Sequence, residues 1–230
     1  MILESIFSCT NLLLTCGSSI YILINHSYTH YSKLFPHFVL ACAGISLIGA
    51  RSFIVLVYKL FFKEYSFDPV IMEIEEERNK GRFNILDEIL GTLSMAGLIY
   101  SLYSCHKYCI LGGCVAISLS ILDVIKLRKM VHDQFQNADV TDFDNSYTQF
   151  YDPSETRFYI LTWVVLGGYF AYTVGNHYAL IANYPFLLTN WALPPEGYYQ
   201  GWTIRRCIND YMMLIYIMCM TEALRQVNPS

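Results

Sequence analysis

Long apolar runs alternate along the chain with shorter polar or aromatic segments. An α-helix rises about 1.5 Å per residue, so a run of about 20 apolar residues crosses a hydrocarbon core about 30 Å thick. About six of the runs approach or exceed that length. We therefore predict an all-α, polytopic integral membrane protein with about six transmembrane helices in a single membrane domain. The predicted domain covers 1–230, with spans at 5–25, 38–62, 89–104, 109–125, 158–182 and 207–223.

The segments between these spans differ in their chemistry. Residues 63–88 are strongly charged, and the pattern after Pro69 predicts a short amphipathic surface helix between the second and third spans. Its glutamate cluster suits a cation site or a solvated, partner-binding face, and we favour the face. Residues 126–157 form a second charged surface segment. Because Trp and Tyr collect at membrane interfaces, we expect the loop 183–206 to be anchored there by four residues. These residues are Trp191, Tyr198, Tyr199 and Trp202.

Small residues recur four positions apart in several of the predicted spans. In membranes, such faces let two helix backbones approach closely. The second span carries Cys42, Ser46 and Ala50 at this spacing. The strongest helix-packing candidates are Gly112 and Ala116 in the fourth span, and Gly167, Ala171 and Gly175 in the fifth.

Composition narrows the class of protein further. The chain is 54% apolar and 15% charged, whereas soluble domains are about 25% charged. The net charge of −4 and the lack of a long basic run argue against nucleic-acid binding. The eight cysteines show no CxxC pair and no zinc-ligand spacing, so we interpret them as packing residues. We expect no metal and no cofactor beyond bound phospholipids.

Arg51 is the one charge deep inside the second span. A charge at membrane depth costs about 2.5–3.5 kcal/mol, so it needs a protein partner. Measured from the outer ends of their predicted spans, Arg51 lies about 20 Å deep, Asp123 about 21 Å and Glu222 about 22 Å. We predict an intramembrane ion pair of Arg51 with Asp123, with Glu222 as the rival acid. Asp210 was excluded because it falls close to the predicted outer surface.

The Arg51 pair has two possible roles. It can fix the register of a second span that stands at the centre of the domain, which we favour. Alternatively, it can form a substrate, lipid-headgroup or proton site.

Six spans would place both termini on the same side of the membrane. Most Lys and Arg residues fall on that side, which is then cytoplasmic or, in a mitochondrion, the matrix side.

No catalytic motif appears: there is no P-loop, GxGxxG, HExxH or GxSxG pattern. We therefore predict a non-catalytic accessory subunit of a larger membrane complex, with other membrane subunits and lipids as its partners. A respiratory or ATP-synthase assembly of the mitochondrial inner membrane is the expected setting. The alternatives are a small channel or transporter lined by Arg51 and Asp123 or Glu222, and a membrane-embedded lipid or redox enzyme.

Overall fold

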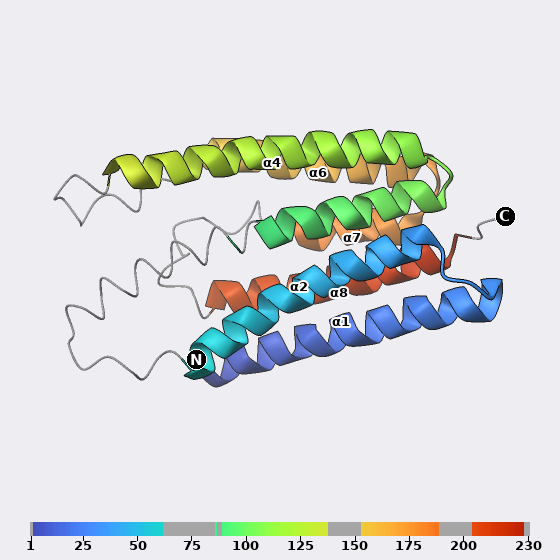
Figure 1. Ribbon diagram of the computed structural model, residues 1–230, viewed down its shortest axis with the longest axis horizontal. Coiled ribbons are helices and arrows are strands. Elements are labelled where there is room, and N and C mark those ends of the chain that lie inside the picture. The colour runs from blue at the N-terminus through green and yellow to red at the C-terminus, as the bar shows by residue number, and fades with distance from the viewer. Residues whose placement is uncertain (1, 62–85, 87–88, 138–152, 189–203, 228–230) are drawn as a thin grey trace.

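The computed structural model describes residues 2–61, 86, 89–137, 153–188 and 204–227. Within these ranges all regular structure is helical, as the sequence predicts. One helix, Ile89–Cys105, carries no label in Figure 1. The others are α1 (Ile2–Tyr31), α2 (Pro36–Phe61), α4 (Cys109–Asn137), α6 (Pro153–Thr173), α7 (His177–Leu187) and α8 (Ile204–Arg225).

The helices lie side by side in an up-and-down bundle (Figure 1). α1 packs against α2 and α8, α7 packs against α8, and α6 packs against α7 and α4. Successive helices run in opposite directions. α1 begins at one end of the bundle and α8 finishes at the other (Figure 1). This arrangement does not support the prediction that both termini lie on one side.

Four of the described helices contain stretches that are long and apolar enough to cross a membrane. The Ile89–Cys105 helix is apolar but shorter, at about 25 Å. The described fold therefore fits a helical integral membrane protein, but the predicted number of six spans is not confirmed. The four stretches are Ile6–Tyr31, Pro36–Ile54, Cys109–Arg128 and Cys207–Arg225.

The predicted fifth span, 158–182, is not one helix. α6 ends two residues before Gly175, and α7 begins two residues after it. Gly175 has a φ of +70°, a left-handed conformation that glycine adopts without a steric cost. The Asn176 N–H donates to the Ala171 carbonyl at 2.9 Å, as in a Schellman ending. The chain therefore reverses here, and α8 runs antiparallel to α2 (Figure 1).

The Ile89–Cys105 helix, and not α2, occupies the middle of the bundle (Figure 1). A Cβ on Gly44 of α2 would lie only 2.9 Å from the Ser94 carbonyl oxygen of this helix. On another side, a Cβ on Gly112 of α4 would lie 2.5 Å from the Tyr103 Cβ. The Ile89–Cys105 helix therefore packs closely against α2 on one side and α4 on another, whereas the sequence predicts the second span at the centre.

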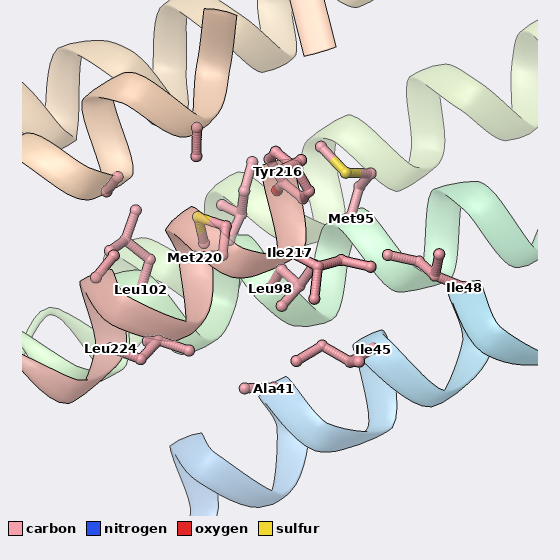
Figure 2. Packing of buried hydrophobic residues seen from close by; sticks show 14 of the residues in the cluster. Ala41, Ile45, Ile48, Met95, Leu98, Leu102, Tyr216, Ile217, Met220 and Leu224 are labelled. Atoms are coloured by element: carbon pink, nitrogen blue, oxygen red, sulfur yellow. The ribbon is translucent and has the colours of Figure 1, made fainter. Parts of the chain in front are cut away.

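Figure 2 shows the apolar core where α2, the Ile89–Cys105 helix and α8 meet. Ile45 and Ile48 of α2 lie close to Leu98, and Ile217 of α8 reaches the same region. All four side chains are buried. Ile45 and Ile48 are three residues apart, so one stripe of α2 supplies this contact.

Several predicted boundaries differ from the structure. α4 continues to Asn137, so the fourth predicted span and the start of the charged segment 126–157 form one helix. Both ends of the predicted interfacial loop 183–206 are helical in the structure, because residues 183–187 belong to α7 and residues 204–206 belong to α8. Most of 63–88, including the predicted amphipathic helix, lies outside the described residues, as do Trp191, Tyr198, Tyr199 and Trp202.

Candidate functional site: two carboxylates between the helices

Asp123 of α4 points into a junction of three helices. Its Oδ2 accepts a hydrogen bond from the Thr92 hydroxyl of the Ile89–Cys105 helix at 3.0 Å. The same oxygen accepts from the indole Nε1–H of Trp163 on α6 at 3.2 Å. Trp163 is buried and Asp123 is half-buried. The acid that the sequence placed at mid-depth therefore joins α4 to two other helices.

Arg51 of α2 approaches the same turn of the Ile89–Cys105 helix. Its Nη1 lies 3.8 Å from the position that a Cβ would take on Gly91, the residue before Thr92. That separation is an ordinary van der Waals contact, so the guanidinium lies directly against this turn. Arg51 and Asp123 therefore reach adjacent residues of one helix, and the ion pair between them stays a prediction.

Glu222 lies elsewhere in the bundle. It forms an ion pair with Arg225 at 2.8 Å in the last turns of α8, with both side chains partly exposed. Because α8 runs antiparallel to α2, the last turns of α8, which hold Glu222, lie toward the end where α2 begins. Arg51 lies about 22 Å along α2 from that beginning. The depth match that made Glu222 the rival partner assumed parallel helices, and the extra reversal at Gly175 removes it.

Asp210 is a carboxylate that the sequence argument set aside. It is only 1% exposed, so it lies inside the bundle. Its Oδ2 accepts from the Ser8 hydroxyl of α1 at 3.0 Å and from the Cys9 thiol at 3.5 Å. The Ser8 hydroxyl also lies 3.5 Å from the Cys207 sulfur. A polar contact between the first and last described helices is thus built around this acid.

The sequence held a signal for the burial of Asp210. Buried residues recur along α8 at spacings of three and four, and Asp210 falls on that stripe. An acid on the apolar stripe of a membrane helix needs donors from a neighbouring helix. The stripe continues through Met213, Ile217, Met220 and Leu224.

A third polar junction lies at the opposite end of the bundle. Asn176 is buried, and its Oδ1 accepts from the Ala179 N–H, which caps α7. Its amide Nδ2 donates to the Ala223 carbonyl of α8 at 2.9 Å and lies 3.5 Å from His106 Nε2. Burial lowers the pKa of His106, which favours the neutral imidazole that can accept this hydrogen bond.

The small residues singled out by the sequence take different places. Gly112 lies in close contact with Tyr103, and Ala116 is buried. Gly167 faces Asn183 of α7, and a Cβ added to Gly167 would lie 3.5 Å from the Asn183 Oδ1. Ala171 is fully buried. Gly175 does not extend this stripe, because it lies in the turn after α6 and an added Cβ there would meet nothing within 4 Å.

The polar groups at these junctions can form hydrogen bonds and bind protons. Among the described residues, no group of three His, Cys, Asp or Glu side chains could hold a metal ion. The carboxylates of Asp123 and Asp210 accept from uncharged hydroxyl, thiol and indole donors. Such acids either fasten helices together or take up and release protons.

No known protein family, curated protein or solved structure matches the chain.

Proposed function

We propose that the protein is a non-catalytic accessory subunit of a larger membrane complex. The observation that supports the proposal is a set of small side chains left uncovered on α1 and α2. Gly17 of α1 has no atom within 4 Å of an added Cβ. Ser46 and Ala50 of α2 are exposed. Small residues on a membrane helix allow a second helix to approach closely, so these positions suit a helix of another subunit.

Small residues inside the bundle already have this role. A Cβ on Gly97 would lie 3.3 Å from the Leu40 carbonyl oxygen of α2, and Gly44 makes a similarly close contact. The Ser46 hydroxyl donates to the Cys42 carbonyl at 2.7 Å, so its polar group is satisfied within α2. The exposed positions therefore have the same packing character as the internal ones, but face outward.

Bulky substitutions at the uncovered positions test the subunit proposal. Gly17→Leu and Ser46→Leu should leave the bundle folded, because their side chains enter open space. They should reduce the amount of partner chains recovered by affinity isolation in mild detergent. On a native gel, the protein should move from a large complex to a small species. Ile117→Phe is the control, because Ile117 of α4 is 63% exposed among other large apolar side chains.

A protein that purifies alone and remains folded in mild detergent would contradict the subunit proposal. Equal loss of partners in the Ile117→Phe control would contradict the choice of α1 and α2 as the contact.

The proposed setting of the complex is the mitochondrial inner membrane, in a respiratory or ATP-synthase assembly. This part is supported only by the type of chain: small, apolar and without a catalytic motif in its sequence. Cell fractionation tests it, since the protein should copurify with inner-membrane markers.

We also propose an orientation for the bundle. Lys126 and Arg128 follow the apolar part of α4, at the end of the bundle where α1 begins. Lys33 and Lys107 lie in turns at the other end, where Arg225 also lies in the last turn of α8. By sequence, Lys59, Lys129, Arg157, Arg205 and Arg206 add basic residues to the first end. Basic residues concentrate on the cytoplasmic or matrix side. We therefore propose that the start of α1 lies on that side and the end of α8 on the opposite side.

A channel or transporter is the second candidate function, favoured by the carboxylates of half-buried Asp123 and buried Asp210. Ionisable groups within membrane segments often mark ion or proton paths. Asp123→Asn and Asp210→Asn should then reduce proton or cation flux into liposomes at unchanged protein content. Wild-type liposomes without flux above the lipid background would rule this candidate out.

A further inference from the structure

Two imidazoles at one end of the bundle each bury a ring nitrogen that has no hydrogen-bond partner among the described residues. His26 lies in the last turns of α1 and His37 in the first turn of α2. In the part of the chain that the structure describes, the Nε2 atoms of both rings are buried and have no hydrogen-bond partner. His37 is only 6% exposed. A neutral imidazole tolerates such a position better than a charged one, because burying a charge costs far more than burying an uncharged polar group.

Aromatic rings surround these two histidines. The His26 ring lies 5.9 Å from the Phe38 ring and 6.0 Å from the Tyr31 ring, edge to face in both cases. The His37 ring lies 4.5 Å from Phe38 and stacks on Phe35 at 5.5 Å. These rings supply packing, but no strong acceptor for an imidazolium N–H.

The charged and titratable groups nearby are mostly basic. On α1, the His30 ring lies 4.5 Å from His26. The Lys33 ammonium lies 4.7 Å from the centre of the Phe35 ring on which His37 stacks. From α8, Arg225 and Glu222 lie in the last turns, at this end of the bundle. Their own ion pair at 2.8 Å already offsets the Glu222 charge. A proton added to His26 or His37 therefore enters surroundings that do not neutralise it.

We propose that His26 and His37 form a proton-sensitive latch that closes the α1–α2 hairpin at this end. With neutral rings, the hairpin packs on Phe38. When protons bind, each ring gains a charge and a second N–H that requires an acceptor, and the hairpin end loosens. In an unfolded chain an imidazole takes up a proton near pH 6.5. Stability therefore falls as the pH is lowered through that range, because the unfolded state binds more protons. The latch is independent of the proposed subunit function.

Thermal unfolding of the full chain in detergent, followed by tryptophan fluorescence, tests the latch. The window runs from about pH 8 to about pH 5.5, which spans the ordinary imidazole range and stays above that of carboxylic acids. We expect the wild-type Tm to fall by about 5 °C across it. In the double variant His26→Phe/His37→Phe, the fall should be at most half as large. The control His177→Gln changes an exposed histidine at the start of α7 and should behave as wild type.

An equal fall in Tm in the double variant and the wild type would overturn the latch. A flattened response in the His177→Gln control would overturn its assignment to these two rings. If the phenylalanine double variant does not fold, the double variant His26→Gln/His37→Gln takes its place, because glutamine cannot take up a proton in this pH window. Its fall in Tm should likewise be at most half that of the wild type, and an equal fall would overturn the latch.

Discussion

Each of the two acids that lie between helices, Asp123 and Asp210, accepts hydrogen bonds from two donors on a single carboxylate oxygen. Asp210 accepts from Ser8 and Cys9, and Asp123 accepts from Thr92 and Trp163. In every case the donor and the acceptor come from different helices. These contacts therefore determine which helices lie beside one another, and at what register, more specifically than apolar packing does.

Removing one donor measures what the contact at Asp210 contributes. Ser8→Ala should lower the free energy of unfolding by about 0.6–1.7 kcal/mol, the range found for hydrogen bonds between membrane helices. Ser18→Ala is the matched control, because the exposed Ser18 hydroxyl bonds only the Thr15 carbonyl of its own helix. Reversible unfolding in mixed detergent gives both values. Equal effects would show that the contact between helices adds nothing.

Asn176 combines two roles that substitution can separate. Asn176→Ala removes the cap of α7 and the hydrogen bond to the Ala223 carbonyl, so we expect a loss of about 2–4 kcal/mol in unfolding free energy. Asn176→Ser keeps a capping oxygen but does not reach Ala223, and should lose about half as much. Thermal unfolding in detergent compares the two. A serine variant as unstable as the alanine variant would mean that the cap contributes little.

Between elements, glycine sets the closest approaches. Gly112 of α4 and its neighbour Gly113 occupy the same helix but face different surroundings. A Cβ on Gly112 would lie 2.5 Å from the Tyr103 Cβ, whereas one on Gly113 would come no closer than 3.7 Å, to the Tyr100 ring. The first position has no room for a methyl group, and the second does.

This difference predicts opposite outcomes for two alanine substitutions. Gly112→Ala should destabilise the bundle by about 1–3 kcal/mol, because overpacking forces α4 away from the Ile89–Cys105 helix. Gly113→Ala should be neutral or stabilising by up to about 1 kcal/mol, from the better helix propensity of alanine. Thermal melts of the two variants provide the comparison. A tolerated Gly112→Ala would contradict the close packing of these helices.

The reversal between α6 and α7 makes a further prediction. Gly175→Ala should cost about 1–2 kcal/mol, because a residue with a Cβ is strained at a positive φ. Gly168→Ala in α6 is the control, since its added Cβ would make only ordinary contacts with Asn183 at 3.7 Å or more. Thermal melts should rank Gly175→Ala below both wild type and control. Equal melting temperatures would argue for a continuous helix over 158–182.

At the scale of the whole molecule, the extra reversal changes the topology. Because α8 runs antiparallel to α2, α1 starts at one end of the bundle and α8 finishes at the opposite end (Figure 1). Reporters of membrane sidedness, fused before residue 1 and after residue 230, should therefore respond on opposite sides. The reporter before residue 1 should be cytoplasmic or in the matrix. If both reporters responded on the same side, the chain would cross the membrane an even number of times, as the sequence predicts, and the topology proposed from the bundle would be wrong.

The helices that the sequence predicted well are those with long, uninterrupted apolar runs. Their length in a bilayer leaves little choice of structure, since the backbone must satisfy its own hydrogen bonds. The stretch 158–182 was misjudged for the same reason: its apolar character hid the turn. The local signal was present, because Gly175 followed by Asn176 joins a preferred helix-ending residue to a preferred capping residue.

The candidate site was predictable only in part. Asp123 was found because it stands alone in an apolar run at mid-depth. Asp210 was excluded by a depth estimate that depends on the ends of the span, whereas its burial depends on Ser8, about 200 residues away in the chain. Glu222 was included by the same kind of estimate, which failed because the direction of α8 was inverted. No local pattern reveals these long-range relations.

The sequence by itself therefore determined the helical class and the apolar helices that could cross a membrane, and it singled out the acid at position 123. Each follows from local composition, because apolar length and an isolated charge carry their energetic cost wherever the helix packs. Only the tertiary structure decided that the chain reverses at Gly175, that the Ile89–Cys105 helix is central, and that Asp210 meets Ser8. Those outcomes depend on which small residues face which neighbours, and close packing between distant segments is fixed by the whole bundle at once.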